Sequence, residues 1–277
     1  MRSPNWTTPI VRRVGQWFAV AAVVAFCVGP LVGQVITSLR SEAAAIAAGT
    51  SAWSLDNYRG ALHGRSLVRS LANSAAVAGM TTLLALAIGS LASFALASLR
   101  LRGQRWFLAG ALAISMFPPI ATVSPLYLVI RELGLRDSLG ALVLSYTTFA
   151  LPLTLFVLTR FFRDIPGAIY EAARVDGCTP FQAWWRIGLP LAMPGIASTA
   201  ILVFIFAYNE FVYALTFISS PEKRTVPVTI SLFASDRIEP WGEIAAASVI
   251  AGIPLVLVTV LFQRRIVTAL TQGAVKD

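Results

Sequence analysis

Six long apolar stretches alternate with short polar loops along the chain. An α-helix rises about 1.5 Å per residue, so about 20 apolar residues cross the roughly 30 Å hydrocarbon core of a bilayer. Backbone N–H and C=O groups find no water in that core, and each stretch is therefore predicted to be a helix. The pattern predicts an all-α polytopic membrane protein, with six transmembrane helices in a single domain, 1–277. The predicted spans are 16–38, 70–99, 106–130, 139–161, 194–218 and 244–262.

Composition supports the membrane assignment. Hydrophobic residues make up 57% of the 277 residues and charged residues 13%, whereas soluble domains average roughly 45–50% and about 25%. One soluble core of this size cannot bury so much apolar surface, which excludes an ordinary globular enzyme, a disordered chain and a disulfide-rich secreted module. We interpret the first stretch as a true span, because it is too long for a signal sequence and lacks a small-residue cleavage site.

The net charge of +9 comes from basic residues spread singly along the chain. We interpret this distribution as membrane topology bias rather than a nucleic-acid-binding surface, and expect no nucleic-acid partner. With six spans both termini fall on one side of the bilayer, and that side carries 13 of the 22 lysines and arginines. Basic residues collect on the cytoplasmic side, so both termini are expected to be cytoplasmic.

The longest loop on that side, 162–193, carries signals for two short helices. Pro166 favours the start of the first, and Gly177 can end it as a left-handed cap. Thr179 and Gln182 have the spacing of a capping box for the second helix, which is expected to stop near Pro190. Trp184 and Trp185 are expected to anchor the loop near the lipid headgroups.

A compact helical loop of this kind can serve as a docking lever for another protein. Ala172 and Ala173 are small enough to allow close approach, and Glu171 offers an acceptor for a basic side chain of a partner. The alternative is an amphipathic helix lying on the membrane surface. Composition alone leaves both interpretations open.

The loop resembles the EAA motif of the membrane subunits of bacterial ABC importers, written EAA-x3-G-x9-I-x-LP. Asp176, which precedes the glycine, is common in the sugar-importing members. The resemblance implies that this segment forms a coupling helix, which seats in a groove of a separate cytoplasmic ATPase and transmits its closure to the spans. The implied coupling residues are Glu171, Ala172, Ala173, Asp176, Gly177, Ile187, Leu189 and Pro190.

The tail resembles that of maltose-type permease subunits, as do the segment FIFAYNEFVYAL and the outer-loop residues 56–58. The resemblance implies a MetI-like type I importer fold, with a core at about 66–265, the coupling loop at 162–193 and a cytoplasmic tail at 263–277. In maltose-type subunits this tail approaches the ATPase dimer interface. A second ATPase contact is therefore expected at Gly273, Ala274, Val275 and Lys276.

The same resemblance implies an assembly in a bacterial cytoplasmic membrane. Its expected members are a second, non-identical permease, an ATPase homodimer and an extracytoplasmic solute-binding protein. ATP and Mg would bind the ATPase subunits, and no cofactor or metal is expected on this chain. The assembly would move a sugar by alternating access, either a di- or oligosaccharide such as trehalose or maltose, or a glycerol-phosphate compound.

The sequence carries no sign of its own catalysis. It has no G-x-x-x-x-G-K-[ST] phosphate loop, and His63 is the only histidine, so neither ATP hydrolysis by that route nor a histidine-based metal or catalytic site is expected. We therefore predict a non-catalytic subunit that depends on a separate ATPase.

Glu210 lies inside a predicted span, next to Tyr208 and Asn209. A carboxylate in lipid costs about 2.5 kcal/mol or more, so it should face the bundle interior or a water-filled path. It could bond across to another helix, or it could line the translocation pathway or its gate together with Tyr208 and Asn209.

Two other classes of function compete with the importer. An ion-coupled secondary transporter would need intramembrane ionisable residues and often has inverted repeats. Glu210 alone supports it, and no internal repeat is evident. A passive channel would leave the helical loop unexplained.

Overall fold

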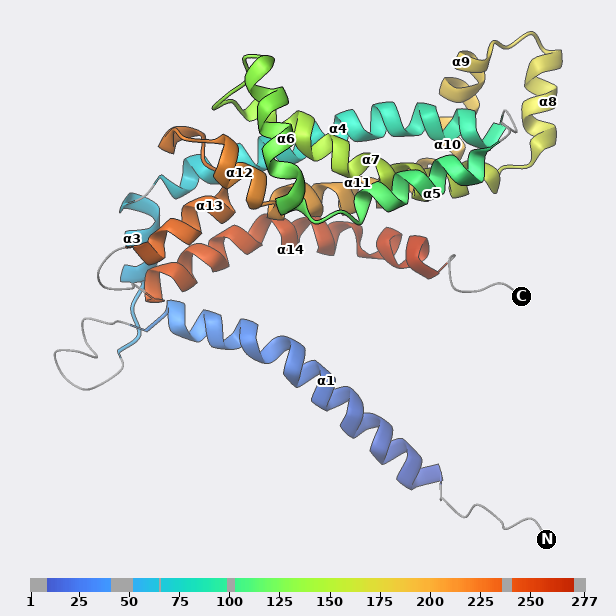
Figure 1. Ribbon diagram of the computed structural model, residues 1–277. Helices are drawn as coiled ribbons and strands as arrows, with labels where there is room; N and C mark the ends of the chain where they lie inside the picture. Colours follow the sequence, from blue (N-terminus) through green and yellow to red (C-terminus); the bar gives the residue numbers. More distant parts are fainter. Residues whose placement is uncertain (1–8, 41–51, 65, 99–102, 236–240, 272–277) are drawn as a thin grey trace. The chain divides into compact units, whose positions relative to one another are not determined.

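The computed structural model describes residues 9–40, 52–64, 66–98, 103–235 and 241–271 (Figure 1). Within these ranges the structure is helical, with an isolated bridge between Arg40 and Trp53 as its β pairing. The chain divides into two compact units. The first comprises Met1–Arg65 and Phe233–Ile250, and the second comprises Ser66–Leu232 and Ala251–Asp277.

In the first unit, hydrogen bonds from Asn57 and its close contact with a glycine of α14 join the described elements. Asn57 donates its side-chain amide to the carbonyl oxygens of Ser38 (3.0 Å) and Arg40 (2.8 Å). A Cβ added at Gly242 would overlap the side-chain amide of Asn57, so a larger residue there would displace this amide from its hydrogen bonds. The elements are α1 (Pro9–Ser38), α3 (Asp56–Gly64) and the start of α14 (Trp241–Thr271).

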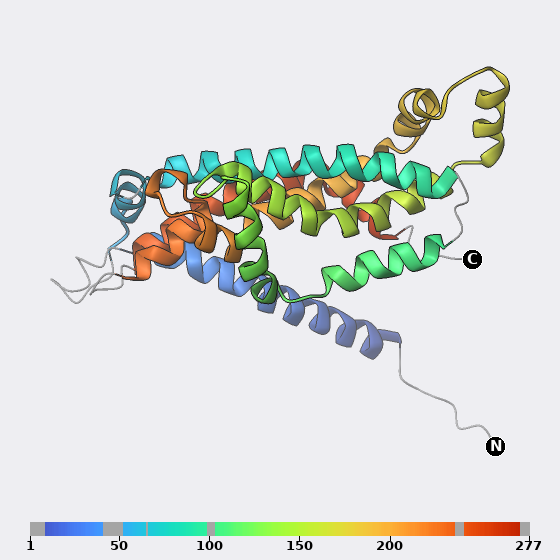
Figure 2. The same cartoon turned by 45° about the horizontal axis from the view of Figure 1, so that its top comes forward.

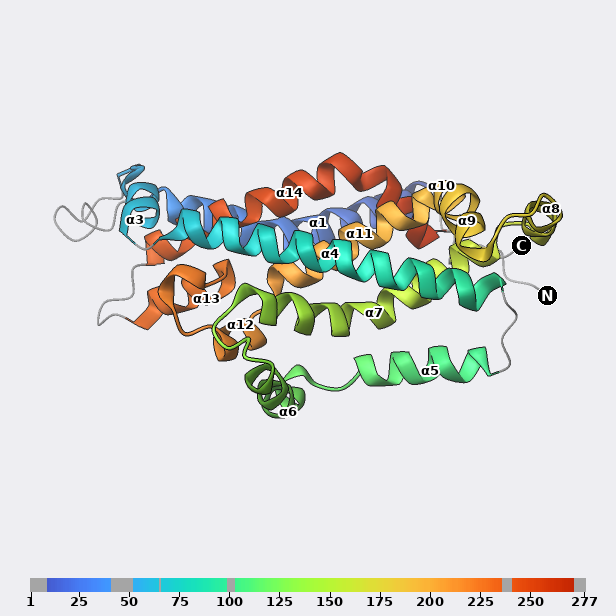
Figure 3. The ribbon, with the colours of Figure 1, turned by 90° about the horizontal axis from the view of Figure 1, so that it is seen from above.

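The second unit is built around three helices that lie side by side (Figure 3). Small residues allow their backbones to approach closely, as is typical of helix packing in membranes. A Cβ added at Gly89 would overlap Thr154, and one added at Gly195 would overlap the ring of Phe161. The three helices are α4 (Leu67–Ser98), α7 (Leu139–Arg163) and α11 (Met193–Asn209).

Four helices of the described chain are long and apolar enough to cross a membrane, and the number rises to six if each of two bent pairs counts as one span. This agrees with the predicted polytopic helical class. The four single helices are Arg13–Ser38, Leu67–Ser98, Leu139–Arg163 and Trp241–Phe262.

The predicted third span, 106–130, is not one straight helix. It consists of α5 (Gln104–Ser115) and α6 (Pro119–Glu132), which are bent by 96°. Pro118 is extended (φ −59°, ψ 130°), because the proline that follows it disfavours helical geometry at the preceding residue. Hydropathy identified the apolar segment correctly but not this break.

The predicted fifth span, 194–218, is also broken. Helix α11 ends at Asn209, Glu210 is extended (φ −68°, ψ 132°), and the short helix α12 (Val212–Phe217) follows. Two further short elements lead away from it, η2 (Pro221–Lys223) and α13 (Val226–Ser231).

Candidate functional site

The loop between α7 and α11 folds into an elbow, which we define as residues 167–191. Its first helix ends as predicted: Gly177 has φ +81°, its N–H donates to the carbonyl of Arg174 (3.1 Å), and Cys178 N–H donates to that of Ala173 (2.9 Å). These bonds form the left-handed cap for which glycine is preferred. The elements of the elbow are α8 (Gly167–Val175), α9 (Pro180–Ala183), the π segment η1 (Trp184–Gly188) and α10 (Leu189–Leu191).

The second half of the elbow begins with the predicted capping box. Thr179 Oγ1 accepts from the N–H of Gln182 (3.3 Å), and Gln182 Oε1 accepts from the N–H of Thr179 (2.9 Å). The helix continues through the π segment to Leu191, one residue beyond the predicted stop at Pro190. The segment Pro180–Leu191 then meets α11 at 80°, so the elbow runs almost directly into a membrane helix.

Aromatic side chains fasten the elbow to the ends of α4 and α7, and Figure 2 shows both elbow helices at that end. The ring of Phe94 makes edge contacts with Phe162 (5.6 Å) and Tyr170 (5.3 Å). Trp184 packs into the same cluster and is buried, while Trp185 is exposed. The expectation that both tryptophans lie at the headgroups is therefore wrong for Trp184, which packs against the helices.

The EAA residues divide between the surface and the interior. Glu171 and Ala172 are exposed, whereas Ala173 is only 4% exposed and packs against its own chain. Direct contact with a partner is therefore expected at Ala172 rather than at Ala173, and the coupling role of both residues stays a prediction. A helix cannot present three successive side chains on one face, and the apolar contacts of the elbow fix which side faces inward.

A hollow of about 950 Å³ lies between the elbow and the ends of α4 and α7. Burial raises the pKa of Tyr170, on its wall, to about 12, so this hydroxyl stays protonated at physiological pH. Three charged side chains line the hollow, and none has an ion-pair partner among the described residues: Arg163, Glu171 and Arg174. The elbow and the end of α7 can therefore offer a carboxylate and two guanidinium groups to another protein.

Glu210 lies at the break between α11 and α12 and caps the second helix. Its Oε1 accepts from the N–H groups of Val212 (2.8 Å) and Tyr213 (3.1 Å), and its Oε2 accepts from that of Ala214 (3.4 Å). A carboxylate at a helix N-terminus satisfies amides that have no partner within the helix. The sequence left open whether Glu210 bonds to another helix. It does so, through the backbone N–H groups of α12, the next helix in the chain.

The two neighbours of Glu210 differ in exposure. Tyr208 is buried and donates its hydroxyl to the carbonyl of Ala251 (3.1 Å). Asn209 is exposed and donates to the carbonyl of Ile205 (2.8 Å). Of the three predicted pathway residues, Asn209 alone presents an exposed side chain, and a role of these residues in a pathway or gate stays a prediction.

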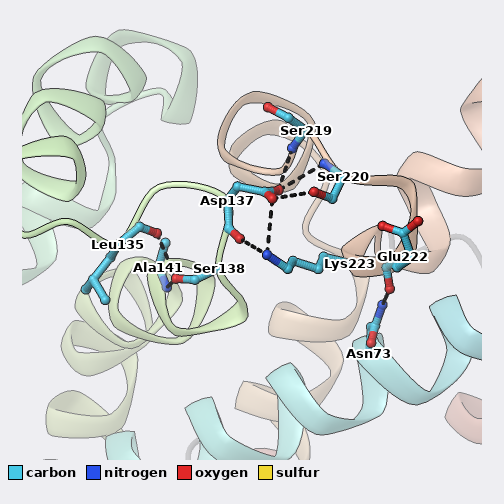
Figure 4. Close-up of polar contacts among 9 residues, drawn as sticks. All are labelled: Asn73, Leu135, Asp137, Ser138, Ala141, Ser219, Ser220, Glu222 and Lys223. Carbon is cyan, nitrogen blue, oxygen red and sulfur yellow. Dashed lines mark hydrogen bonds and ion pairs between the residues drawn. The ribbon is translucent and has the colours of Figure 1, made fainter.

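A second polar site, which the sequence did not indicate, lies just before the start of α7, whereas the elbow follows its end. Figure 4 shows its polar contacts. Asp137 Oδ1 accepts from the N–H groups of Ser219 and Ser220, both at 2.9 Å. Its Oδ2 accepts from the Ser220 hydroxyl and from Lys223 Nζ (3.1 Å), which also donates to the Asp137 carbonyl (2.6 Å). We call these four residues the Asp137 cluster.

The hydrogen bonds of the Asp137 cluster stabilise the charged form of the Asp137 carboxyl group. Hydrogen bonds from the hydroxyl of Ser220 and from the N–H groups of Ser220 and Ser219, followed by Lys223, hold the pKa of Asp137 well below its usual value. For a carboxyl group with a lowered pKa, the stabilisation is present above the ordinary pKa and is lost as the pH falls through the lowered one. Asp137 also has a left-handed backbone (φ 51°).

Helix α4 fixes the other side of the same loop. Asn73 donates to the carbonyl oxygens of Glu222 (2.8 Å) and Arg224 (3.0 Å), and Ser74 Oγ accepts from the N–H of Val226 (2.8 Å). The segment that follows α12 is therefore bonded on two sides, although loops of this kind are usually mobile.

The other predicted coupling residues lie in the elbow: Asp176 and Pro190 are exposed, and Ile187 and Leu189 are half-buried. The predicted tail residues Gly273, Ala274, Val275 and Lys276 lie outside the described part of the chain. Within the described part, histidine, cysteine and carboxylate side chains form no group of three that could hold a metal ion.

The apolar helices, with an elbow fastened to the ends of two of them, define a multi-pass membrane protein with a motif typical of transport subunits. Residues 85–272 match the family of binding-protein-dependent transport system inner membrane components, and the chain belongs to this family. It is therefore a permease subunit of the ABC importer class, as predicted.

Relatives and a solved structure agree with this assignment. The chain is 44% identical over 223 residues to the trehalose transport system permease protein SugB of Mycobacterium tuberculosis, covering 80% of this chain and 81% of the relative. It is 36% identical over 272 residues to the trehalose/maltose transport system permease protein MalG of Thermococcus litoralis, covering 96% and 98%.

The fold is also that of a solved ABC transporter involved in the import of the acidic polysaccharide alginate. The TM-score is 0.77 at 20% identity, and the match covers 95% of this chain and 99% of the other. At this identity the likeness concerns the fold alone, and it confirms the predicted MetI-like permease architecture.

Proposed function

We propose that this chain is a non-catalytic permease subunit that imports a sugar, driven by ATP hydrolysis in a separate ATPase homodimer. The observation that carries the proposal is the complete EAA motif folded into an elbow, with Glu171 and Ala172 exposed and the aromatic cluster fastened to two membrane helices. Such an elbow can pass force from a soluble motor to the bundle, since α11 follows it directly. ATP and Mg would bind the ATPase subunits, and this chain would hold no cofactor.

The proposed orientation places the elbow and both termini on the cytoplasmic side of a bacterial cytoplasmic membrane. The excess of basic residues on that side supports it. The Asp137 cluster, at the opposite end of α7, would then face outward. A second, non-identical permease would complete the pathway, and a solute-binding protein, which the family name implies, would deliver the solute.

In this mechanism the permease pair alternates between inward and outward access, and ATP binding biases the equilibrium. Closure of the ATPase dimer moves the elbow, whose contacts with Phe94 and Phe162 carry the movement to α4 and α7. Tightly packed interfaces transmit such a shift because they deform little. Trehalose and maltose are the proposed substrates, because the two relatives described above are named as trehalose and trehalose/maltose permeases. Glycerol-phosphate compounds are the second choice.

Uptake by the reconstituted four-component assembly tests the proposal. Proteoliposomes would hold both permeases and the ATPase, with ATP inside and the binding protein outside, and labelled trehalose or maltose would be supplied. We expect uptake that requires ATP and is blocked by vanadate. Uptake that follows a proton gradient without the ATPase would instead support an ion-coupled secondary transporter. Glu210 gives that alternative little support, because both its oxygens bond to α12.

Charge reversal at Glu171 is expected to weaken the attachment of the ATPase. Glu171 is exposed on α8 and has no ion-pair partner among the described residues, so Glu171→Lys should spare insertion while repelling a basic partner side chain. We expect less ATPase to co-purify and uptake to fall by about tenfold or more, since hydrogen bonds to charged groups are among the stronger ones. Asp164→Lys, at an exposed position outside the motif, serves as the control. Equal losses in the two variants would contradict a specific role for Glu171.

A further inference from the structure

The two predicted spans that the structure breaks, 106–130 and 194–218, both lead into the Asp137 cluster. Helix α6, the second half of the first of these spans, leads into the corner that contains Asp137, and α12, the helix after the break at Glu210, leads into Ser219 and Ser220. A backbone hydrogen bond adds to these contacts: Asp137 N–H donates to the carbonyl of Phe217, the last residue of α12 (3.2 Å). One carboxylate thus links two segments more than 80 residues apart in sequence.

The first turns of the same two helices are also joined. The hydroxyl groups of Thr122 and Tyr213 lie 2.5 Å apart, and the Tyr213 hydroxyl is 3.4 Å from the carbonyl of Pro119. Helices α6 and α12 are therefore tied together at their starts and just beyond their ends. Each tie joins one helix to the other, while the helices themselves are separated from α5 and α11 by breaks.

These contacts matter because a helix as short as α12 is not stable by itself. It has six residues, and isolated helices shorter than about 12 residues are marginal in water. Its position therefore depends on packing against α7, where the rings of Tyr213 and Phe149 are stacked 5.2 Å apart, on Glu210 at its start and on the Asp137 cluster at its end. The breaks before α6 and α12 supply the few non-helical residues at which such segments can turn.

We infer that α6, α12 and the loops that follow them form one rigid bracket, and that Asp137 is the positioning residue that keeps it together while the subunit changes access. This inference rests on the proposed function, since it concerns movement during transport. The bracket comprises 119–137 and 212–225. Asn73 of α4 donates to the carbonyl oxygens of Glu222 and Arg224, so the bracket stays with α4 while α5 turns relative to it at the break before α6. The parts of the bracket do not separate during the cycle.

Replacing the ionic tie by a covalent one tests the role of Asp137. We expect Asp137→Ala to lower ATP-driven uptake by about tenfold or more, because the N–H groups and the ammonium group that face it lose a charged acceptor. The pair Asp137→Cys and Ser220→Cys should show the same loss when reduced, since the two side chains are in contact but no longer ionic. Bridging the two thiols with a short bifunctional reagent should restore uptake. Uptake unaffected by Asp137→Ala, or no recovery on bridging, would overturn the inference.

If the Asp137 variants do not assemble, the inference is tested on chains that keep Asp137, by measuring the distance between the two halves of the bracket. Spin labels on Glu132→Cys and Glu222→Cys lie at exposed positions on the two halves of the bracket. Their separation should be the same in the nucleotide-free and vanadate-trapped complexes, and a change in it would overturn the inference. Co-purification of the ATPase is measured in parallel, because the elbow lies at the other end of α7. Loss of ATP-driven uptake in the unmodified assembly would instead count against the proposed function.

Discussion

Uptake falls to background in the Gly177→Pro variant, which is the largest effect that we expect from a single substitution. Gly177 has φ +81°, in the left-handed region, whereas proline is held near −65°. Proline also removes the N–H that donates to Arg174. The turn between α8 and α9 would have to open, so the EAA face would no longer match its partner, and co-purified ATPase should fall together with uptake.

The matched control for this variant is Gly167→Ala in the same elbow. A Cβ added at Gly167 would meet nothing within 4 Å, and the backbone there has no positive φ, so alanine should fit and uptake should stay close to that of the unmodified protein. Membrane insertion is measured for both variants by extraction and protease accessibility. Normal uptake by a well-inserted Gly177→Pro chain would show that the elbow does not couple the two subunits.

Gly89→Leu is expected to have the second-largest effect, and to act on folding rather than on coupling. A Cβ at this position would overlap Thr154 across the α4–α7 contact, so the two helices must separate to admit a larger side chain. Overpacking of this kind typically costs about 1–3 kcal/mol, a large part of the total stability of most domains. We expect a lower unfolding temperature in detergent and less inserted protein at steady state.

Gly79→Leu, in the same helix, provides the control for this second variant. Its added Cβ meets nothing within 4 Å, so the leucine should be accepted at a lipid or partner surface. Both substitutions replace glycine by leucine in α4, but only the one at Gly89 faces a side chain of α7. Equal destabilisation of the two variants would show that close packing of α4 against α7 does not account for the stability of the bundle.

The elbow could be predicted from the sequence because its signals are local. Gly177 marks the turn, and Thr179 and Gln182 mark the next helix start, all within six residues. The spans could be predicted for a related reason, since hydropathy needs only composition over about 20 residues. Such a window does not reveal direction, so it does not predict the 96° bend between α5 and α6. The consecutive prolines Pro118 and Pro119 indicate a kink in this span, but not its size.

The features that sequence analysis missed depend on contacts between distant segments. Asp137 and Ser220 are 83 residues apart, and nothing in the sequence around either residue indicates the pairing. The burial of Ala173 and Trp184 depends on how the elbow packs, and Trp184 belongs to the same buried cluster as Phe94 and Phe162, which lie on other helices. Glu210 stands out in the sequence as an acid inside a predicted span, but its capping role depends on the break before α12, which the sequence does not show.

Photocrosslinking through position 172 tests the central claim most directly, since Ala172 is exposed on the elbow and Ala173 is buried beside it. A crosslinking amino acid would replace each alanine in turn, in membranes that contain the complete assembly. The account predicts that the probe at position 172 captures the ATPase subunit in high yield, whereas the probe at position 173 captures little of it. Capture of lipid alone at position 172 would contradict the account.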